Sequence, residues 1–181
     1  MGFLSWLNKV FGDSAEPQPE AAPTASLEAY LPYLLELERL VQNDLLKNAL
    51  PSLRTNWQRV KIQDLDRIKT SSASVLNDII TKFDEKRTNI KLAMPNSSNN
   101  FQERLESTQR EITMFKNSIE NMPLQSAHAN GALMMALRNL TITKGGVVRK
   151  TEELDNSLRR LLEELQERKS GLNVGEKQVS A

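Results

Sequence analysis

Apolar side chains recur at steps of three and four residues through most of this chain, the spacing of one face of an α-helix. The most regular pattern lies between Asn100 and Pro123. Asn100 and Glu103 form a capping-box pattern, so the sequence predicts a helix that starts near Asn100 and ends before Pro123. Its apolar seam has heptad spacing and consists of Phe101, Leu105, Thr108, Ile112, Phe115, Ile119 and Met122.

The same spacing predicts two earlier helices. The first covers residues 26–50 and ends at Pro51, because proline lacks the N–H that a helix interior needs. The second covers residues 52–93, and its weak point is the Thr/Ser-rich run at 70–74. Its length is typical of a coiled coil or a long hairpin. Residues 94–99 are dense in turn formers and predict a loop.

The last third of the chain carries two more helical patterns. Residues 125–140 are rich in Ala and Met, and the Asn-Gly pair at 130–131 weakens this helix. Residues 140–148 have β character around a Gly-Gly pair, where we expect a helix–loop–helix joint rather than an isolated hairpin. A final helix up to residue 169 follows, with a leucine stripe that consists of Leu154, Leu158, Leu161, Leu162 and Leu165.

These elements predict an all-α fold, a helical bundle or antiparallel coiled-coil body of four to five helices. We divide the chain into an amphipathic N-terminal helix at 1–12, a flexible Pro/Ala linker at 13–25, the bundle at 26–169 and a disordered tail at 170–181. The residues expected to form the core, or the seam of an oligomer, are Phe101, Leu105, Ile112, Phe115, Ile119, Leu154, Leu158, Leu161 and Leu165.

The first twelve residues, which we call the tip, combine an apolar stripe with a flexible attachment. Wound as a helix, they place Ser5, Asn8 and Lys9 on one side. The linker that follows contains three prolines and could reach about 40 Å. The apolar side, with Trp6 at its edge, consists of Phe3, Leu4, Trp6, Leu7, Val10 and Phe11.

Three roles for the tip follow from this pattern. It could lie in a membrane surface, dock in the groove of a partner protein, or fold back onto its own bundle. As a membrane anchor it would be about 14 Å long, too short to span a bilayer. One copy would bind weakly and reversibly, with Lys9 near the lipid phosphates. Several copies joined in a homo-oligomer would bind more strongly, because linked weak contacts act together.

The start Met-Gly-Phe-Leu-Ser-Trp-Leu is similar to the lipid-binding N-termini of phage-shock and ESCRT-III-like membrane-remodelling proteins. The resemblance implies membrane binding for the tip. It covers only about a dozen residues. Those proteins continue into a long uninterrupted hairpin, whereas this chain has a Pro-rich linker and then Pro51. We therefore assign no family from it.

Composition argues against several classes of function. Lys and Arg number 24 against 23 Asp and Glu, which argues against a dedicated nucleic-acid binder, because such proteins usually carry a basic excess. The chain has no cysteine, so it has no disulfide, thiolate zinc site or cysteine nucleophile. The start lacks the basic region of a signal peptide. We expect a cytoplasmic protein, peripheral to the inner face of a membrane.

Candidate chemistry is sparse. His128 is the only histidine, and a metal site needs several converging ligands, so we expect no metal and no cofactor. Adjacent carboxylates on the predicted helices point about 100° apart and do not converge. The sequence therefore predicts a non-enzymatic, peripheral membrane scaffold or adaptor. The alternative is a structural subunit of a larger protein assembly, with the tip docked in a partner.

Overall fold

The computed structural model of the chain describes residues 27–94, 99–122 and 130–179. These residues are almost entirely helical and contain no strand, which confirms the all-α prediction. The first arm is formed by α2 (Leu27–Arg39), the π-helix η1 (Leu40–Ala49) and α3 (Leu50–Arg59). The other arms are α4 (Leu65–Ala93), α5 (Asn99–Glu120) and α6 (Asn130–Val179).

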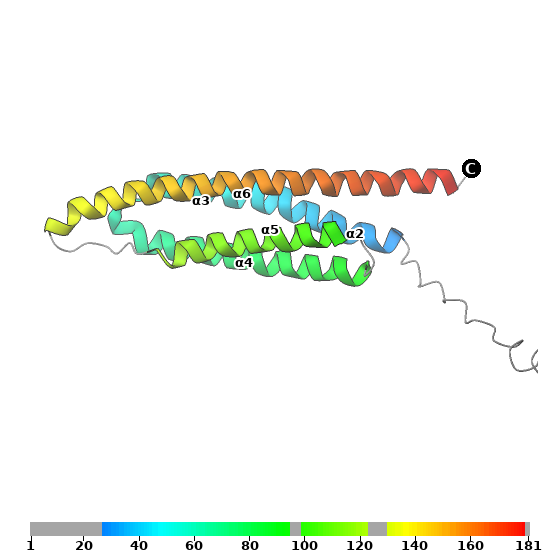
Figure 1. Ribbon diagram of the computed structural model, residues 1–181, viewed down its shortest axis with the longest axis horizontal. Helices are drawn as coiled ribbons and strands as arrows, with labels where there is room; N and C mark the ends of the chain where they lie inside the picture. Colours follow the sequence, from blue (N-terminus) through cyan, green and yellow to red (C-terminus); the bar gives the residue numbers. More distant parts are fainter. Residues whose placement is uncertain (1–26, 95–98, 123–129, 180–181) are drawn as a thin grey trace, which may run out of the picture.

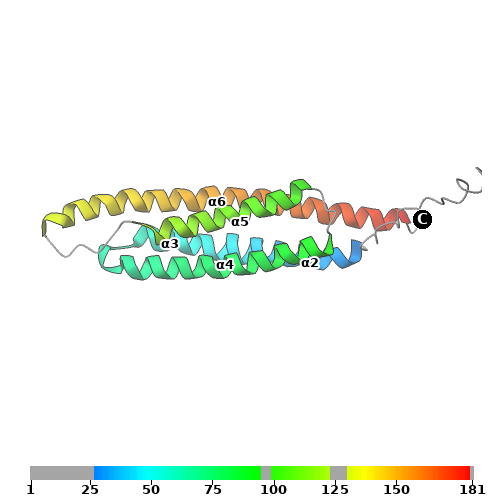
Figure 2. The ribbon, with the colours of Figure 1, turned by 60° about the horizontal axis from the view of Figure 1, so that its bottom comes forward.

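The four arms run alternately up and down along one long axis (Figures 1 and 2). The first arm contacts α4 and α6, and α5 contacts the same two neighbours. Diagonal pairs of described helices, such as α4 and α6, have no backbone contact. Each arm therefore lies beside two antiparallel neighbours, which is the arrangement of an up-and-down four-helix bundle.

The first arm passes through Pro51, so the predicted helix end at residue 50 is wrong. In the π-helix before the proline, each turn is wider, and the Leu50 N–H donates to the carbonyl of Leu45, five residues earlier. A wider turn moves the preceding carbonyls away from the proline ring, which removes the clash that normally breaks a helix. Pro51 then occupies the first turn of α3. The arm continues to Arg59 and buries Leu53 and Trp57.

The first reversal of the chain lies at residues 60–64, where a continuous helix was expected. Val60 and Lys61 leave the helix with ψ angles of 137° and 160°. A short 3-10 turn, η2 (Ile62–Asp64), then leads into α4, which runs through residues 70–74 and ends at Ala93 as predicted. The sequence has no Gly or Pro to mark this reversal. Burial of Val60 and Leu65 on its two sides holds it in place.

The last arm is one helix, α6, over residues where two helices and a joint were expected. Gly145 and Gly146 both have helical geometry, and neither has a positive φ angle. The helix also continues through residues 170–179, where the sequence predicts a disordered tail. Two glycines cost a helix about 2 kcal/mol together. Packing of the neighbouring Leu140 and Val147 against the bundle offsets this cost.

The core is a single cluster of side chains drawn from all four arms. Trp57, Phe83 and Phe101 are its largest fully buried members. The nine residues predicted for the core or an oligomer seam all lie in it, each less than 5% exposed. They are thus covered within a single chain, and a contact between copies would have to use other residues.

Candidate functional surfaces

The structure divides the predicted site residues into two groups. Those of the core seam are buried, as described above. The tip residues Phe3, Leu4, Trp6, Leu7, Lys9, Val10 and Phe11 lie outside the described residues, and so do the linker and His128. The proposed roles of the tip therefore stay predictions.

The polar side chains inside the described core serve packing. Trp57 donates from Nε1 to Oγ of Ser72 over 3.0 Å, which joins α3 to α4 across the interior. Thr108 and Thr151 are also buried, and each donates its hydroxyl to a carbonyl of its own helix, at 2.9 and 2.6 Å. Each of these three buried hydroxyl side chains has a hydrogen-bond partner, as a stable interior requires.

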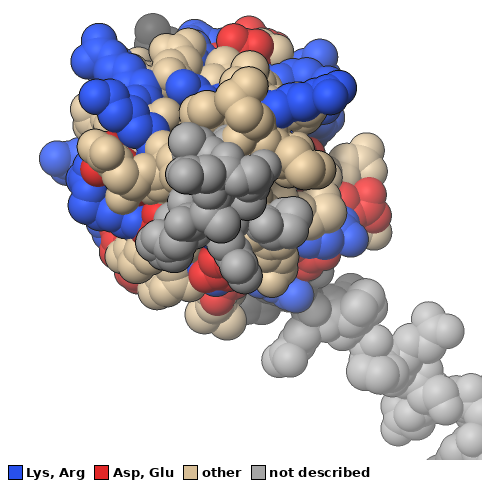
Figure 3. All heavy atoms as spheres, turned by 90° about the vertical axis from the view of Figure 1, so that its left-hand side faces the viewer, with Lys and Arg blue, Asp and Glu red and all other residues tan. Residues whose placement is uncertain are grey.

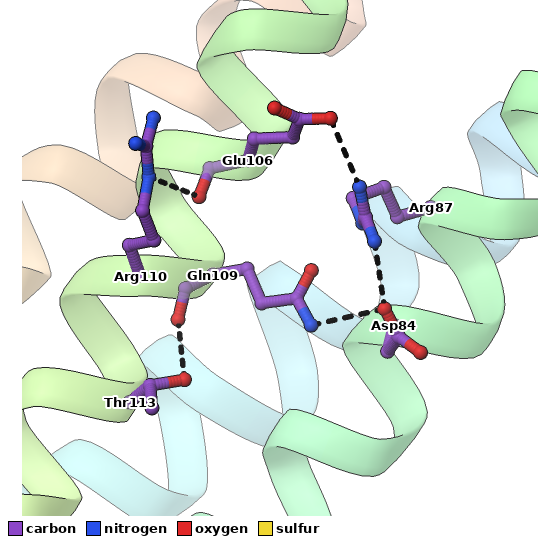
Figure 4. Close-up of polar contacts among 6 residues, drawn as sticks. All are labelled: Asp84, Arg87, Glu106, Gln109, Arg110 and Thr113. Atoms are coloured by element: carbon purple, nitrogen blue, oxygen red, sulfur yellow. Dashed lines mark hydrogen bonds and ion pairs between the residues drawn. The ribbon is translucent and has the colours of Figure 1, made fainter.

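A polar network joins α4 to α5 (Figure 4). Arg87 bridges Asp84 of its own helix at 2.9 Å and Glu106 of α5 at 3.2 Å. Gln109 donates to the same Asp84 oxygen over 3.0 Å. The hydrogen bond from Arg87, followed by the one from Gln109, holds the pKa of the Asp84 carboxyl below its usual value. Since Asp84 is half exposed, this network contributes modestly and fixes how the two helices align.

Two lysines tie the first arm to other arms in a similar way. Lys86 of α4 lies 2.9 Å from Glu36 of α2, and the hydrogen bond that Lys86 donates to this carboxylate, more than the one it donates to Glu85, raises the pKa of the lysine. Lys169 of α6 lies 2.6 Å from Glu38 of α2. These contacts join neighbouring arms, so the charges here specify the packing of the bundle.

The outer surface has one region that differs from the rest. Among the described residues, eight large apolar side chains are exposed, and four of them fall within nine residues near the start of α6. These are Met134, Met135, Leu137 and Ile142. The sequence predicts this segment as part of the bundle at 26–169. The sequence does distinguish this segment from the rest of the bundle, because no Asp or Glu occurs anywhere in residues 121–151.

The end of the bundle near this segment is rich in basic side chains. Figure 3 views this end and shows Lys and Arg around much of its rim. Arg59 and Lys61 are exposed at the reversal between α3 and α4, and the exposed Arg67 lies 3.2 Å from Asp64. Lys144 of α6 donates to the carbonyl of Val60 over 3.4 Å, and this contact joins α6 to the reversal.

The described residues lack two further kinds of feature. None of the helices there is long and apolar enough to cross a bilayer. The same part of the chain holds no group of three or more His, Cys, Asp or Glu side chains placed to bind a metal ion.

The fold defines the chain as an antiparallel four-helix bundle protein. Comparison with known proteins gives no match to a family model, to a curated protein or to a solved structure.

Proposed function

We propose that this protein is a non-enzymatic, peripheral membrane scaffold that attaches reversibly through its tip. In this role the apolar side of the tip inserts at the membrane surface, and Lys9 meets lipid phosphates. The observation that carries the proposal is the pairing of a dense apolar stripe at residues 3–11 with a bundle whose core cluster is built from its own four arms. Such a core needs no further apolar segment to complete it.

The expected strength of this attachment follows from its size. Full burial of a large apolar side chain is worth about 1.5–3 kcal/mol, and burial at an interface gives a fraction of that. Ordering a short helix costs part of this gain. One tip therefore binds weakly, and several tips in one assembly bind together with much higher strength.

The polar contacts of the bundle support a scaffold role. The Asp84–Arg87–Glu106 network and the Lys169–Glu38 pair each join two arms. A body held together in this way presents its two ends at a fixed separation. The first arm from Leu27 to Arg59 alone is about 50 Å long at 1.5 Å per residue.

Vesicle flotation of the full chain tests the proposal. Trp6→Glu with Leu7→Glu should abolish flotation with neutral vesicles and leave the helical circular dichroism of the bundle unchanged. Ser5→Glu with Asn8→Glu adds the same charge to the polar side of the tip and should float much better than the first pair. If the first pair floats as well as the natural chain, the membrane role of the tip is wrong. Lipid-independent capture of one protein by the tip, lost in the same pair, would favour the assembly-subunit alternative.

A further inference from the structure

The start of α6 carries an apolar surface that the bundle leaves uncovered. We call residues 130–150 the basic segment of α6. Its Met134, Met135 and Ile142 are 74%, 70% and 65% exposed. On a helix of 3.6 residues per turn, Met135 and Ile142 are seven positions apart and share one face, and Arg138 lies between that face and Met134. This face is opposite the buried Leu140 and Val147.

Charge separates this segment from the remainder of the same helix. Residues 130–150 contain Arg138, Lys144, Arg149 and Lys150 and no acidic residue. The second part of the helix is mixed in charge, because Glu152, Glu153, Glu163 and Glu167 are exposed there together with Arg159 and Arg160. Glu153 also lies 3.6 Å from Arg149 of the basic segment. An anionic surface would therefore attract the first part of α6 more strongly than the second part.

The position of the segment suits a contact made by one end of the rod. In both ribbon views α6 begins beyond the ends of α3 and α4 (Figures 1 and 2). The basic side chains Arg59 and Lys61 are exposed at the adjacent reversal. Basic side chains (Figure 3) and the exposed apolar side chains of α6 thus occur together at this end of the molecule.

We infer that the basic segment of α6 is a second binding surface, and that its partner is an anionic lipid surface. Cationic side chains over an apolar helix face match lipid phosphates above acyl chains. A second copy of this chain fits poorly on the same face, since two basic segments without any acidic residue would repel each other.

Combined with the proposed function of the tip, this inference makes the protein a bridge. The described chain begins at Leu27, at the end of the bundle opposite to the start of α6 (Figure 1). A tip that extends away from the bundle on its linker, which could reach about 40 Å, lies at the far end of a first arm roughly 50 Å long. A tip at one end and the basic segment at the other would then join two membranes. This step rests on the proposed function, whereas lipid binding by α6 does not.

Flotation of full-length variants measures lipid binding by the tip and by the basic segment of α6 separately. The probes are vesicles of phosphatidylcholine alone and of equal parts phosphatidylcholine and phosphatidylserine. With the tip disabled by Trp6→Glu and Leu7→Glu, the chain should still float with the anionic vesicles and not with the neutral ones. Adding Met135→Glu and Ile142→Glu should weaken this remaining binding by about tenfold or more, because it removes two inserted side chains and adds two negative charges.

A matched control has the same charge change elsewhere. Leu92→Glu with Met114→Glu replaces side chains that are 75% and 63% exposed on α4 and α5. This pair should lower anionic binding far less than the α6 pair. Equal losses in the two pairs would show a net-charge effect and overturn the inference. Absence of anionic binding by the tip-disabled chain would also overturn it, while leaving the proposed role of the tip intact.

Vesicle clustering tests the bridge itself. The natural chain should raise light scattering of the anionic vesicles, and either disabled surface alone should abolish that rise while some binding remains. Clustering that survives loss of the α6 surface would contradict bridging through this end. Neutral binding that survives loss of the tip would instead count against the proposed function.

Discussion

The two parts of α6 belong to one helix, yet they differ in what surrounds them. From Thr151 to Leu165, an apolar residue or threonine points into the bundle at every third or fourth position and is almost fully buried. From Met134 to Ile142, large apolar side chains are mostly exposed, and Leu140 alone among them is buried. The amino-acid types overlap, so the difference comes from the neighbours beside each part. Apolar residues become core only where another arm runs alongside.

The largest expected effect is a difference in stability between two similar truncations, one in each part of α6. Leu158→Ala removes a fully buried side chain and should lower the free energy of unfolding by about 2–5 kcal/mol, because it leaves a cavity. Ile142→Ala should change it by about 0.5 kcal/mol or less, because that side chain is mostly exposed. Urea denaturation followed by circular dichroism measures both. Similar losses would mean that the first part of α6 is packed.

The next largest effect on stability is expected from the loss of a buried hydrogen bond between α3 and α4. Ser72→Ala leaves the indole N–H of Trp57 without its partner in the core and should cost about 1–3 kcal/mol of unfolding free energy. Ser71→Ala, one position away at an exposed site, serves as the control and should be nearly neutral. If the two variants lose equal free energy of unfolding, the hydrogen bond between Trp57 and Ser72 does not stabilise the core.

The exposed part of α6 predicts a gain in stability. A Cβ added at Gly145 or Gly146 meets no atom within 4 Å, and alanine is a better helix former than glycine by about 1 kcal/mol per residue. The double change to alanine should therefore raise the free energy of unfolding by about 1–2 kcal/mol in the same denaturation experiment. A loss of stability would indicate that the chain needs a break here, as the sequence alone suggested.

The smallest effect concerns the α4–α5 network and depends on pH. The lowered pKa of Asp84 means that its contribution is present above the ordinary carboxyl pKa of 3.8 and is lost as the pH falls through the lower folded value. Asp84→Asn should therefore cost less than about 1 kcal/mol near pH 7, with the difference fading below about pH 4. Asp78→Asn, whose partner Lys82 is on the same helix, should cost less still. Thermal unfolding at several pH values measures both.

The prediction from periodicity was most accurate where one helix packs along its neighbours without interruption. The seam from Phe101 to Ile119 is buried as a continuous stripe, and α4 ends at Ala93 where the loop was expected. It was least accurate where the ends of helices were predicted from single prolines or glycines. Pro51 did not end a helix, the Gly145–Gly146 pair made no joint, and the reversal at residues 60–64 carried no breaker at all.

Sequence alone therefore determined the helical class and the identity of most core residues. The tip and its linker stay predictions. Tertiary structure decided where the chain turns, which helices are continuous and which apolar residues remain uncovered. The physical reason lies in the size of the competing terms. A proline or glycine changes local helix stability by about 3 or 1 kcal/mol. Burial of side chains such as Leu50, Leu53 and Trp57 along one seam contributes about 1.5–3 kcal/mol each.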